Sequence, residues 1–237
     1  MSNLDELVPK FLVFKNVLSL VRDRGFTVPP EMEKFLQYND VDHLGLFLEF
    51  LENSRAIDQG VVQMNRLSHY FYHTLPDGNQ VGLGVYFTGP LQNGMKEVSK
   101  AIIGNVTTIF DTMPQIVQHV LVNPAKLSTD AKSQLQKYEA MYRVTSFMED
   151  ELYHNPTEHF LTPPHERLNL DVPSEREAFL TSMNLTSANA LPKMETTCPI
   201  AKWYGFVEGD IIRAVRDCGG MGLTCQYITS YRQVTAP

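Results

Sequence analysis

Residues 191–213 read Leu-Pro-Lys-Met-Glu-Thr-Thr-Cys-Pro-Ile-Ala-Lys-Trp-Tyr-Gly-Phe-Val-Glu-Gly-Asp-Ile-Ile-Arg and form the most ordered pattern of the chain. Ile211–Val215 and Tyr227–Tyr231 have the β-branched and aromatic composition of short strands. The glycine-rich stretch 219–222 predicts a turn between these two strands. The C-terminal part of the chain therefore predicts a small α+β module.

The segment before this module has the character of a domain boundary. Residues 160–192 are rich in prolines and polar side chains. Within them, Ser174 and Glu177 have the spacing of a capping box, which predicts the start of one helix. We therefore expect an N-terminal domain of residues 1–150 and a C-terminal module of residues 151–237.

The N-terminal domain alternates helix and strand patterns. Apolar positions at three- and four-residue steps predict an amphipathic helix from Val8 to Val21 that ends before Gly25. The other predicted elements are helices at 31–38 and 41–51, strands at 61–75 and 81–88 around a turn at 76–79, a helix at 98–109, a buried strand at 116–122 and a helix from 128 to 138. This alternation predicts a three-layer α/β domain, and the whole chain falls in the α+β class.

The composition excludes several classes of protein. The chain has 237 residues, 43% of them apolar and 20% charged, as expected for a folded globular protein. Its formal net charge of −7 argues against a stand-alone nucleic-acid-binding protein. The apolar stretch from Phe11 to Val21 is too short and too interrupted for a membrane span, so we expect no membrane partner.

Histidines are the residues most suggestive of a metal site. His69 and His73 share one face of a predicted strand, but no third ligand accompanies them. His154, His159 and His165 crowd one segment, where nearby prolines preclude a helical His-Glu-x-x-His arrangement. A zinc hydrolase built on these three histidines remains an alternative hypothesis.

Other catalytic signatures are incomplete. Cys198, Cys218 and Cys225 contain no Cys-x-x-Cys pair, which favours a reducing compartment and small buried side chains. Gly219–Gly222 lacks the lysine and hydroxyl residue of a phosphate-binding loop, and no Gly-x-Ser-x-Gly elbow occurs. We therefore expect no catalytic residues, no metal and no cofactor.

The C-terminal string resembles the family of the fifth subunit of eukaryotic DNA-dependent RNA polymerases, whose C-terminal part matches a subunit of archaeal RNA polymerases. That family's pattern is Leu-Pro-Arg-Ile, an acidic residue, Pro-Val-Ala-Arg-Tyr-Phe-Gly, then Gly-x-Val-Val-x-Ile-x-Arg and Tyr-x-x-Tyr-Arg. Other segments similar to the family are Arg22–Phe26, Leu127–Leu135, Phe147–Leu152, Asn155–His159, Pro164-His165 and the Tyr227, Ile228, Tyr231 and Arg232 set. In the family, Phe147–Leu152 corresponds to a helix.

Several departures from the family pattern indicate a divergent copy. Cys198 replaces the acidic residue, Thr129 replaces a proline and Asp130 replaces a serine. The loop between Arg216 and Tyr227 is a few residues longer than usual, and one residue is added before Tyr231. Such a copy is expected to be specialised for one polymerase or encoded by a virus.

The resemblance implies a non-catalytic polymerase subunit. Its N-terminal domain would form part of the lower jaw near downstream duplex DNA, and its C-terminal module would dock on the largest subunit, alongside other polymerase subunits. It also implies a nuclear location, or a cytoplasmic one for a viral protein. The implied interface residues are His159, Pro164, His165, Pro199, Ala201, Lys202, Trp203, Gly205, Tyr227 and Arg232.

The implied contact with DNA is weak. In the family the segment around Ser128 opens a helix that faces the downstream duplex, and Lys126 and Lys132 are the nearby cations in the sequence. Asp130 places a carboxylate in the same first turn, where it competes with an approaching phosphate. Residues 1–150 hold 13 basic and 17 acidic side chains, a formal charge of −4.

Two further alternatives stay open. Pro199, Gly205, Gly209 and Tyr227 fit turn geometry and core packing as well as they fit direct interface contact, and burial is favoured for Trp203. The two glycines are expected at positive φ. A free regulatory protein of similar fold, which binds polymerase transiently, is the alternative function.

Overall fold

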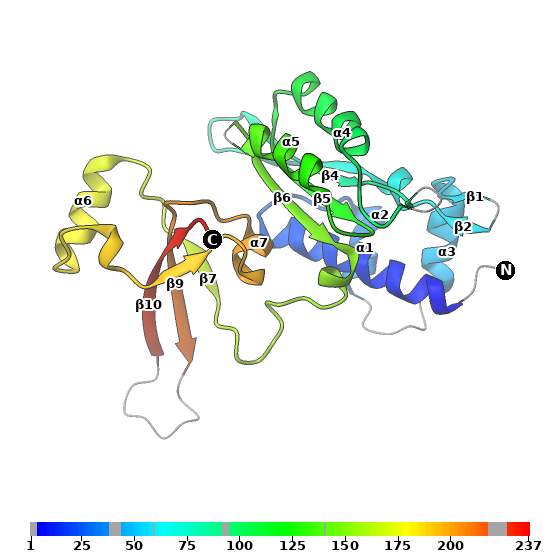
Figure 1. Ribbon diagram of the computed structural model, residues 1–237. Coiled ribbons are helices and arrows are strands. Elements are labelled where there is room, and N and C mark those ends of the chain that lie inside the picture. The colour runs from blue at the N-terminus through cyan, green and yellow to red at the C-terminus, as the bar shows by residue number, and fades with distance from the viewer. Residues whose placement is uncertain (1–3, 38–43, 59, 92–94, 140, 218–226) are drawn as a thin grey trace. The chain divides into compact units, whose positions relative to one another are not determined.

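The computed structural model describes residues 4–37, 44–58, 60–91, 95–139, 141–217 and 227–237 (Figure 1). Backbone contacts divide the chain into two compact units, Met1–His154 and Asn155–Pro237. Their division falls at His154, four residues beyond the boundary expected from the sequence. No helix among the described residues has both the length and the apolar character that a membrane crossing requires.

The first unit is built around a four-stranded sheet of order β3-β4-β5-β6. These strands are β3 (His69–Thr74), β4 (Gln80–Phe87), β5 (Ile116–Asn123) and β6 (Arg143–Met148). β3 runs antiparallel to β4, whereas β4, β5 and β6 run parallel to one another. The run Gly82–Phe87 is almost wholly buried, which is the pattern of a strand covered on both faces.

Helices cover both faces of this sheet (Figure 1). α4 (Lys100–Thr112) and α5 (Thr129–Glu139) connect the parallel strands and share a core with Tyr86 and Leu121. α1 (Leu4–Asp23) lies over the other face, where Arg24 donates to Gln118 Oε1 at 3.3 Å and to Thr145 Oγ1 at 3.2 Å. The expected three-layer α/β arrangement is therefore present.

Aromatic packing joins the smaller elements to α1. These elements are α2 (Pro30–Glu33), the 3-10 turn η1 (Lys34–Leu36), α3 (Leu44–Asn53), β1 (Ile57–Asp58), β2 (Val61–Val62) and η3 (Met64–Leu67). Phe35 and Phe47 contact Phe11 and Phe14 of α1 with ring centroids 5.3 to 6.4 Å apart. Aromatic pairs of this kind stabilise a fold beyond their buried area.

The second unit is a four-stranded sheet of order β7-β9-β10-β8. Its elements are β7 (His165–Arg167), α6 (Pro173–Ser182), η5 (Ala188–Ala190), β8 (Lys193–Glu195), α7 (Pro199–Tyr204), β9 (Ile211–Asp217) and β10 (Tyr227–Thr235). β9 and β10 form the antiparallel hairpin expected from the sequence, and β8 pairs in parallel with the end of β10. α7 packs near Ile212 and Val234, whereas Phe179 and Leu180 of α6 pack near Ile211.

Several sequence-based expectations about elements were wrong. The 61–75 strand is divided into β2, η3 and β3, and the 31–38 helix into α2 and η1. The capping box is wrong as well, because α6 begins at Pro173 and its N-cap residue is Val172, whose side chain makes no capping hydrogen bond. Proline favours the first helical position, and this preference places the N-cap at Val172, two residues before the predicted N-cap Ser174.

The expected helix at 147–152 is also wrong. Phe147 and Met148 end β6, and Glu149–Leu152 form the 3-10 turn η4, in which Glu151 Oε2 accepts from the Met148 N–H at 2.7 Å. The short elements β6, β7, β8 and α7 have no counterpart among the predicted elements. The predicted turn at 219–222, with Cys218 and Cys225, lies outside the described residues, as do residues 38 and 41–43 of the predicted helices.

Candidate functional site

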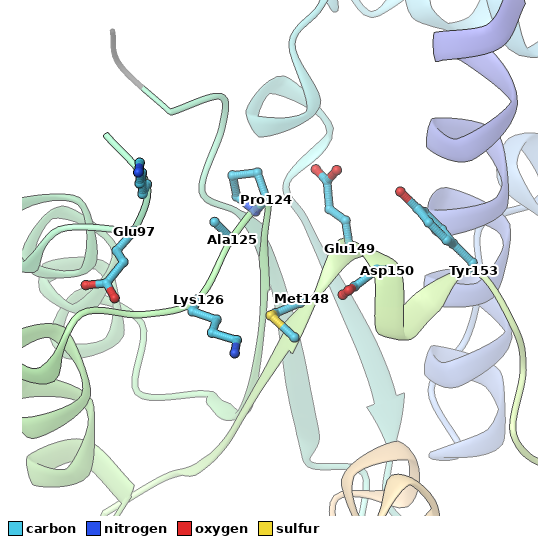
Figure 2. A pocket seen from close by; sticks show the side chains of 9 residues that line it. Glu97, Pro124, Ala125, Lys126, Met148, Glu149, Asp150 and Tyr153 are labelled. Atoms are coloured by element: carbon cyan, nitrogen blue, oxygen red, sulfur yellow. The ribbon is translucent and has the colours of Figure 1, made fainter. Parts of the chain in front are cut away.

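A groove lies at the edge of the first unit's sheet where its parallel strands end. The loops that follow β5 and β6 line a pocket of about 400 Å³ there (Figure 2). Its lining residues are Lys96, Glu97, Pro124, Ala125, Lys126, Met148, Glu149, Asp150 and Tyr153. A second pocket of about 710 Å³ shares Lys96 and Glu97 with the first and extends to Lys100, Ser128 and Asp130. Open α/β sheets bind ligands at this edge, outside the carboxyl ends of their strands.

Two helix N-termini open on this groove because each helix follows a parallel strand. Ser99 precedes α4, and Ser128 precedes α5 and accepts from the Ala131 N–H at 3.3 Å. The two segments are joined by backbone hydrogen bonds from the Val98 N–H to the Lys126 carbonyl and from the Ser128 N–H to the Val98 carbonyl. The Ser128 start predicted from the sequence is confirmed.

The groove has mixed charge. Figure 2 shows Glu97 and Lys126 on one side of the first pocket and Glu149, Asp150 and Tyr153 on the other. Glu149 accepts from Lys10 Nζ at 2.5 Å. Burial raises the pKa of the Tyr153 phenol, and the two neighbouring carboxylates raise it further. The pocket is therefore a poor binding site for a dense array of phosphates.

Two lysines of this groove were not predicted from the sequence. Lys126 and Lys132 were expected to be the only nearby cations, which is wrong, because Lys96 and Lys100 line the same pocket as Ser128. The bridge between Val98 and Leu127 brings together segments that are far apart in sequence. Lys132 is exposed in α5 and is not a lining residue.

A buried ion pair organises the second unit. Asp210 is almost completely buried at the start of β9, and its Oδ1 accepts from Arg167 Nε at 2.8 Å. Its Oδ2 accepts from the Val207 N–H at 2.9 Å. Burial alone lowers the pKa of Arg167, but the hydrogen bonds and charges of Asp210 and Asp171 outweigh it and raise that pKa. This pair ties β7 to the connection between α7 and β9.

The expected interface residues separate into buried and exposed groups. Ala201, Trp203 and Gly205 are buried, and Trp203 is only 1% exposed. These residues lie beneath the surface of the unit rather than on it. For Trp203, burial was the outcome that the sequence favoured. The residues with exposed or half-buried side chains are His159, Pro164, His165, Pro199, Lys202, Tyr227 and Arg232.

Only some of these residues share a face. His165 lies opposite Ala214, and Arg232 lies opposite Ile212, so both project to the α7 side of the sheet. Burial lowers the pKa of His165, a hydrogen bond to the Pro163 carbonyl opposes this, and the nearby guanidinium groups of Arg232 and Arg216 lower it further. Arg216 was not among the expected residues.

Tyr227 and His159 lie apart from that cluster. Tyr227 projects to the opposite face of the sheet because it is an odd number of positions from Arg232. His159 is exposed in the segment before β7, where its Nδ1 accepts from the Leu161 N–H at 3.3 Å and its ring stacks on Phe160.

The histidine-based metal hypothesis gains no support from the geometry. Within the described ranges, no three His, Cys, Asp or Glu side chains are placed to hold a metal ion. His154, His159 and His165 do not form a common ligand set, and His69 contacts the ring of Phe71 in β3.

Comparison with known proteins agrees with the resemblance. Residues 154–234 match the family described as RNA polymerase Rpb5, C-terminal domain. The chain is 24% identical over 222 residues to a protein of Arabidopsis thaliana named DNA-directed RNA polymerase subunit 5-like protein 1, covering 90% of each chain. It is 25% identical over 226 residues to the Caenorhabditis elegans protein named DNA-directed RNA polymerases I, II, and III subunit RPABC1, covering 93% of this chain and 92% of the relative. The Caenorhabditis briggsae protein of the same name is 27% identical over 221 residues.

The matched residues make up nearly all of the second unit, which follows an α/β domain in the chain. Residues 154–234 therefore match the Rpb5 C-terminal domain, and the chain is similar along most of its length to proteins named as RNA polymerase subunits.

Proposed function

We propose that this chain is a non-catalytic subunit of a DNA-dependent RNA polymerase. The observation that carries the proposal is the match along nearly the full length of relatives named as polymerase subunits, with the family domain at residues 154–234. Its two units fit a scaffold that connects other subunits. Because the relatives are eukaryotic, the proposed location is the nucleus.

The second unit docks on the largest polymerase subunit in this proposal. Its support is that Pro199 and Arg232 of the family motifs are exposed, over a core that contains Trp203, and that Tyr227 is exposed on the opposite face of the sheet. His165 and Arg216 extend the surface beside Arg232. Ala201 and Gly205 act indirectly, because their burial fixes the shape of α7 and its C-terminal turn.

The first unit lies near downstream DNA and contacts it weakly in this proposal. Lys126 and Ser128 of the groove, with Lys132 beside it, are the proposed contacts, and Lys96 and Lys100 join them. The carboxylates of Glu97 and Asp130 oppose a phosphate at the same place. Other subunits therefore hold most of the duplex.

Affinity purification tests the subunit role. The chain is tagged in its own cells and purified with its partners through a high-salt wash, and the associated proteins are identified by mass spectrometry. We expect the largest polymerase subunit to remain bound. Loss of all polymerase subunits in the wash would indicate a free regulatory protein that binds transiently.

A further inference from the structure

The outer edge of β10 is the longest unpaired backbone edge in the described part of the second unit. β10 runs from Tyr227 to Thr235, but β8 pairs only with Gln233, Val234 and Thr235. The two edge strands of the sheet, β7 and β8, are only three residues long each, so β8 leaves most of β10 uncovered. Unpaired strand edges are templates for pairing with another chain, and natural proteins usually protect them.

The hydrogen-bond pattern shows which groups of β10 point outward. Val234 donates to the Asp210 carbonyl at 2.9 Å and accepts from the Gly209 N–H at 2.9 Å, so its backbone groups face β9. Gln233 donates to the Pro192 carbonyl at 2.9 Å, on the β8 side. Because backbone groups alternate along a strand, the N–H and C=O groups of Tyr227, Thr229 and Tyr231 point away from β9.

Pro192 stops β8 from covering these groups. In a continued parallel ladder, the Tyr231 carbonyl would accept a hydrogen bond from the N–H of residue 192. Proline has no N–H, so β8 cannot continue the ladder to Tyr231. No described backbone group pairs with the outward groups of Tyr227, Thr229 or Tyr231.

The side chains along this edge favour strand addition. The sequence Tyr227-Ile-Thr-Ser-Tyr-Arg232 is rich in β-branched and aromatic residues, and Arg232 is its only charge. Tyr227 is 58% and Ile228 is 44% exposed, on opposite faces of the strand. A natural edge of this length normally has more charges, a proline or a bulge to prevent pairing.

Charge indicates what kind of strand the edge accepts. Arg213 on β9 is paired with Glu166 of β7, whereas Arg232 has no carboxylate partner within the described residues. Arg232 and Arg216 lie close to His165 on the α7 side of the sheet. An added strand with an acidic side chain opposite Arg232 would neutralise this face.

We infer that the β10 edge binds an extended, acidic segment of a partner polypeptide as a fifth strand of the sheet, with its backbone paired to Tyr227, Thr229 and Tyr231. The inference rests on the proposed function, because that partner belongs to the polymerase. Strand addition obtains affinity from main-chain hydrogen bonds and specificity from alternate side chains.

Residue-resolved amide hydrogen exchange tests this inference on the full chain, alone and in the purified polymerase. In the free chain, the amides of Ile228, Ser230 and Arg232 face β9 and are protected, whereas those of Tyr227, Thr229 and Tyr231 exchange freely. In the complex, we expect the exchange of the Tyr227, Thr229 and Tyr231 amides to slow at least tenfold. A complex in which they exchange as fast as in the free chain overturns strand addition and leaves the subunit role standing. Failure to form any complex overturns both.

A matched pair of variants provides a second test. Thr229→Pro removes one outward N–H and leaves the hydrogen bonds to β9, whereas Thr229→Val changes the same side chain and keeps the N–H. We expect roughly tenfold weaker retention of Thr229→Pro in the polymerase and unchanged retention of Thr229→Val. Circular dichroism and thermal unfolding establish that both variants fold. Equal retention of two folded variants contradicts the inference.

Discussion

Gly205 shows how single residues end the helices of this chain. It has φ of 68° after α7, its N–H donates to the Lys202 carbonyl, and the Phe206 N–H donates to the Ala201 carbonyl. This is the Schellman arrangement, which satisfies carbonyls that the helix leaves unpaired. Gly25 after α1 and Asn184 after α6 end their helices in the same way, as does Arg55 after α3. Arg55 adopts this left-handed conformation although its side chain disfavours it.

Valine at Gly205 is expected to destabilise the second unit. The backbone there is left-handed, which a β-branched residue strongly disfavours, so Gly205→Val should lower the free energy of unfolding by about 2 kcal/mol or more. Gly209→Val, at φ of 91°, should act in the same direction. Urea denaturation and incorporation into polymerase measure the effect. The exposed control Glu195→Ala should be neutral, and equal stability of all three variants would contradict this view of the turns.

Within the elements, His119 makes the helix–sheet core of the first unit sensitive to pH. It is completely buried in β5, its ring stacks on Phe110 with centroids 3.6 Å apart, and its Nδ1 lies 3.2 Å from Tyr86 Oη. Burial lowers the pKa of His119 to about 4, although a hydrogen bond to the Ile116 backbone opposes the change. The folded chain therefore holds His119 neutral.

Acid is expected to destabilise the first unit through His119. The unfolded chain takes up the proton near pH 6.5 and the folded chain only near pH 4, so stability present above pH 6.5 is lost as the pH falls towards 4. The difference approaches about 3 kcal/mol at pH 4. Urea unfolding of the full chain at several pH values measures it, with His119→Phe as the non-titrating comparison. An unchanged acid slope in that variant would show that other groups are responsible.

The groove lysines are expected to make a small contribution to DNA binding. Replacing Lys126 and Lys132 by alanine in the assembled polymerase should reduce the salt dependence of elongation-complex stability by about one to two units of slope. Adding Lys96→Ala and Lys100→Ala should reduce the salt dependence only a little further. The carboxylates of Glu97 and Asp130 line the same pocket and already oppose a phosphate there. Lys137→Ala, near the other end of α5, is the control. An unchanged salt slope in the Lys126→Ala, Lys132→Ala double variant would contradict the proposed weak contact, and so would a slope change well above two units.

Periodicity predicted the longer elements well. α1, α4, β4, β5 and the β9–β10 hairpin agree because their apolar residues recur over enough positions to define a period. The short elements were missed: β7 and β8 have three residues each, and long-range pairing rather than local pattern makes them strands.

The candidate sites were predicted only in part for the same reason. Motif similarity pointed to Ser128 and to the C-terminal string, and burial was favoured for Trp203, but the string did not show that Ala201 is buried as well. Lys96 and Lys100 reach the groove through a bridge between distant segments. One signal could have placed these lysines beside Ser128. Ser99 and Ser128 start helices in two successive strand–helix connections, and such connections meet at the same edge of a sheet.

At the scale of the whole molecule, the second unit is expected to fold alone and to suffice for docking. Its core around Ile211 and Ile212 and its Asp210–Arg167 ion pair lie within residues 155–237. A fragment of residues 153–237 should unfold cooperatively and bind the docking region of the largest subunit, in contrast to residues 1–150. An unfolded fragment, or one that binds no better than residues 1–150, would show that the first unit is required.

The ratio of this chain to the largest polymerase subunit in purified complexes tests the central claim most directly. Quantitative mass spectrometry measures that ratio before and after a wash at about 1 M salt, where exposed charge interactions are screened beyond about 3 Å. A stably built-in subunit predicts a ratio near one-to-one that the wash leaves unchanged. A ratio far below one, or one that falls towards zero in high salt, would contradict the account.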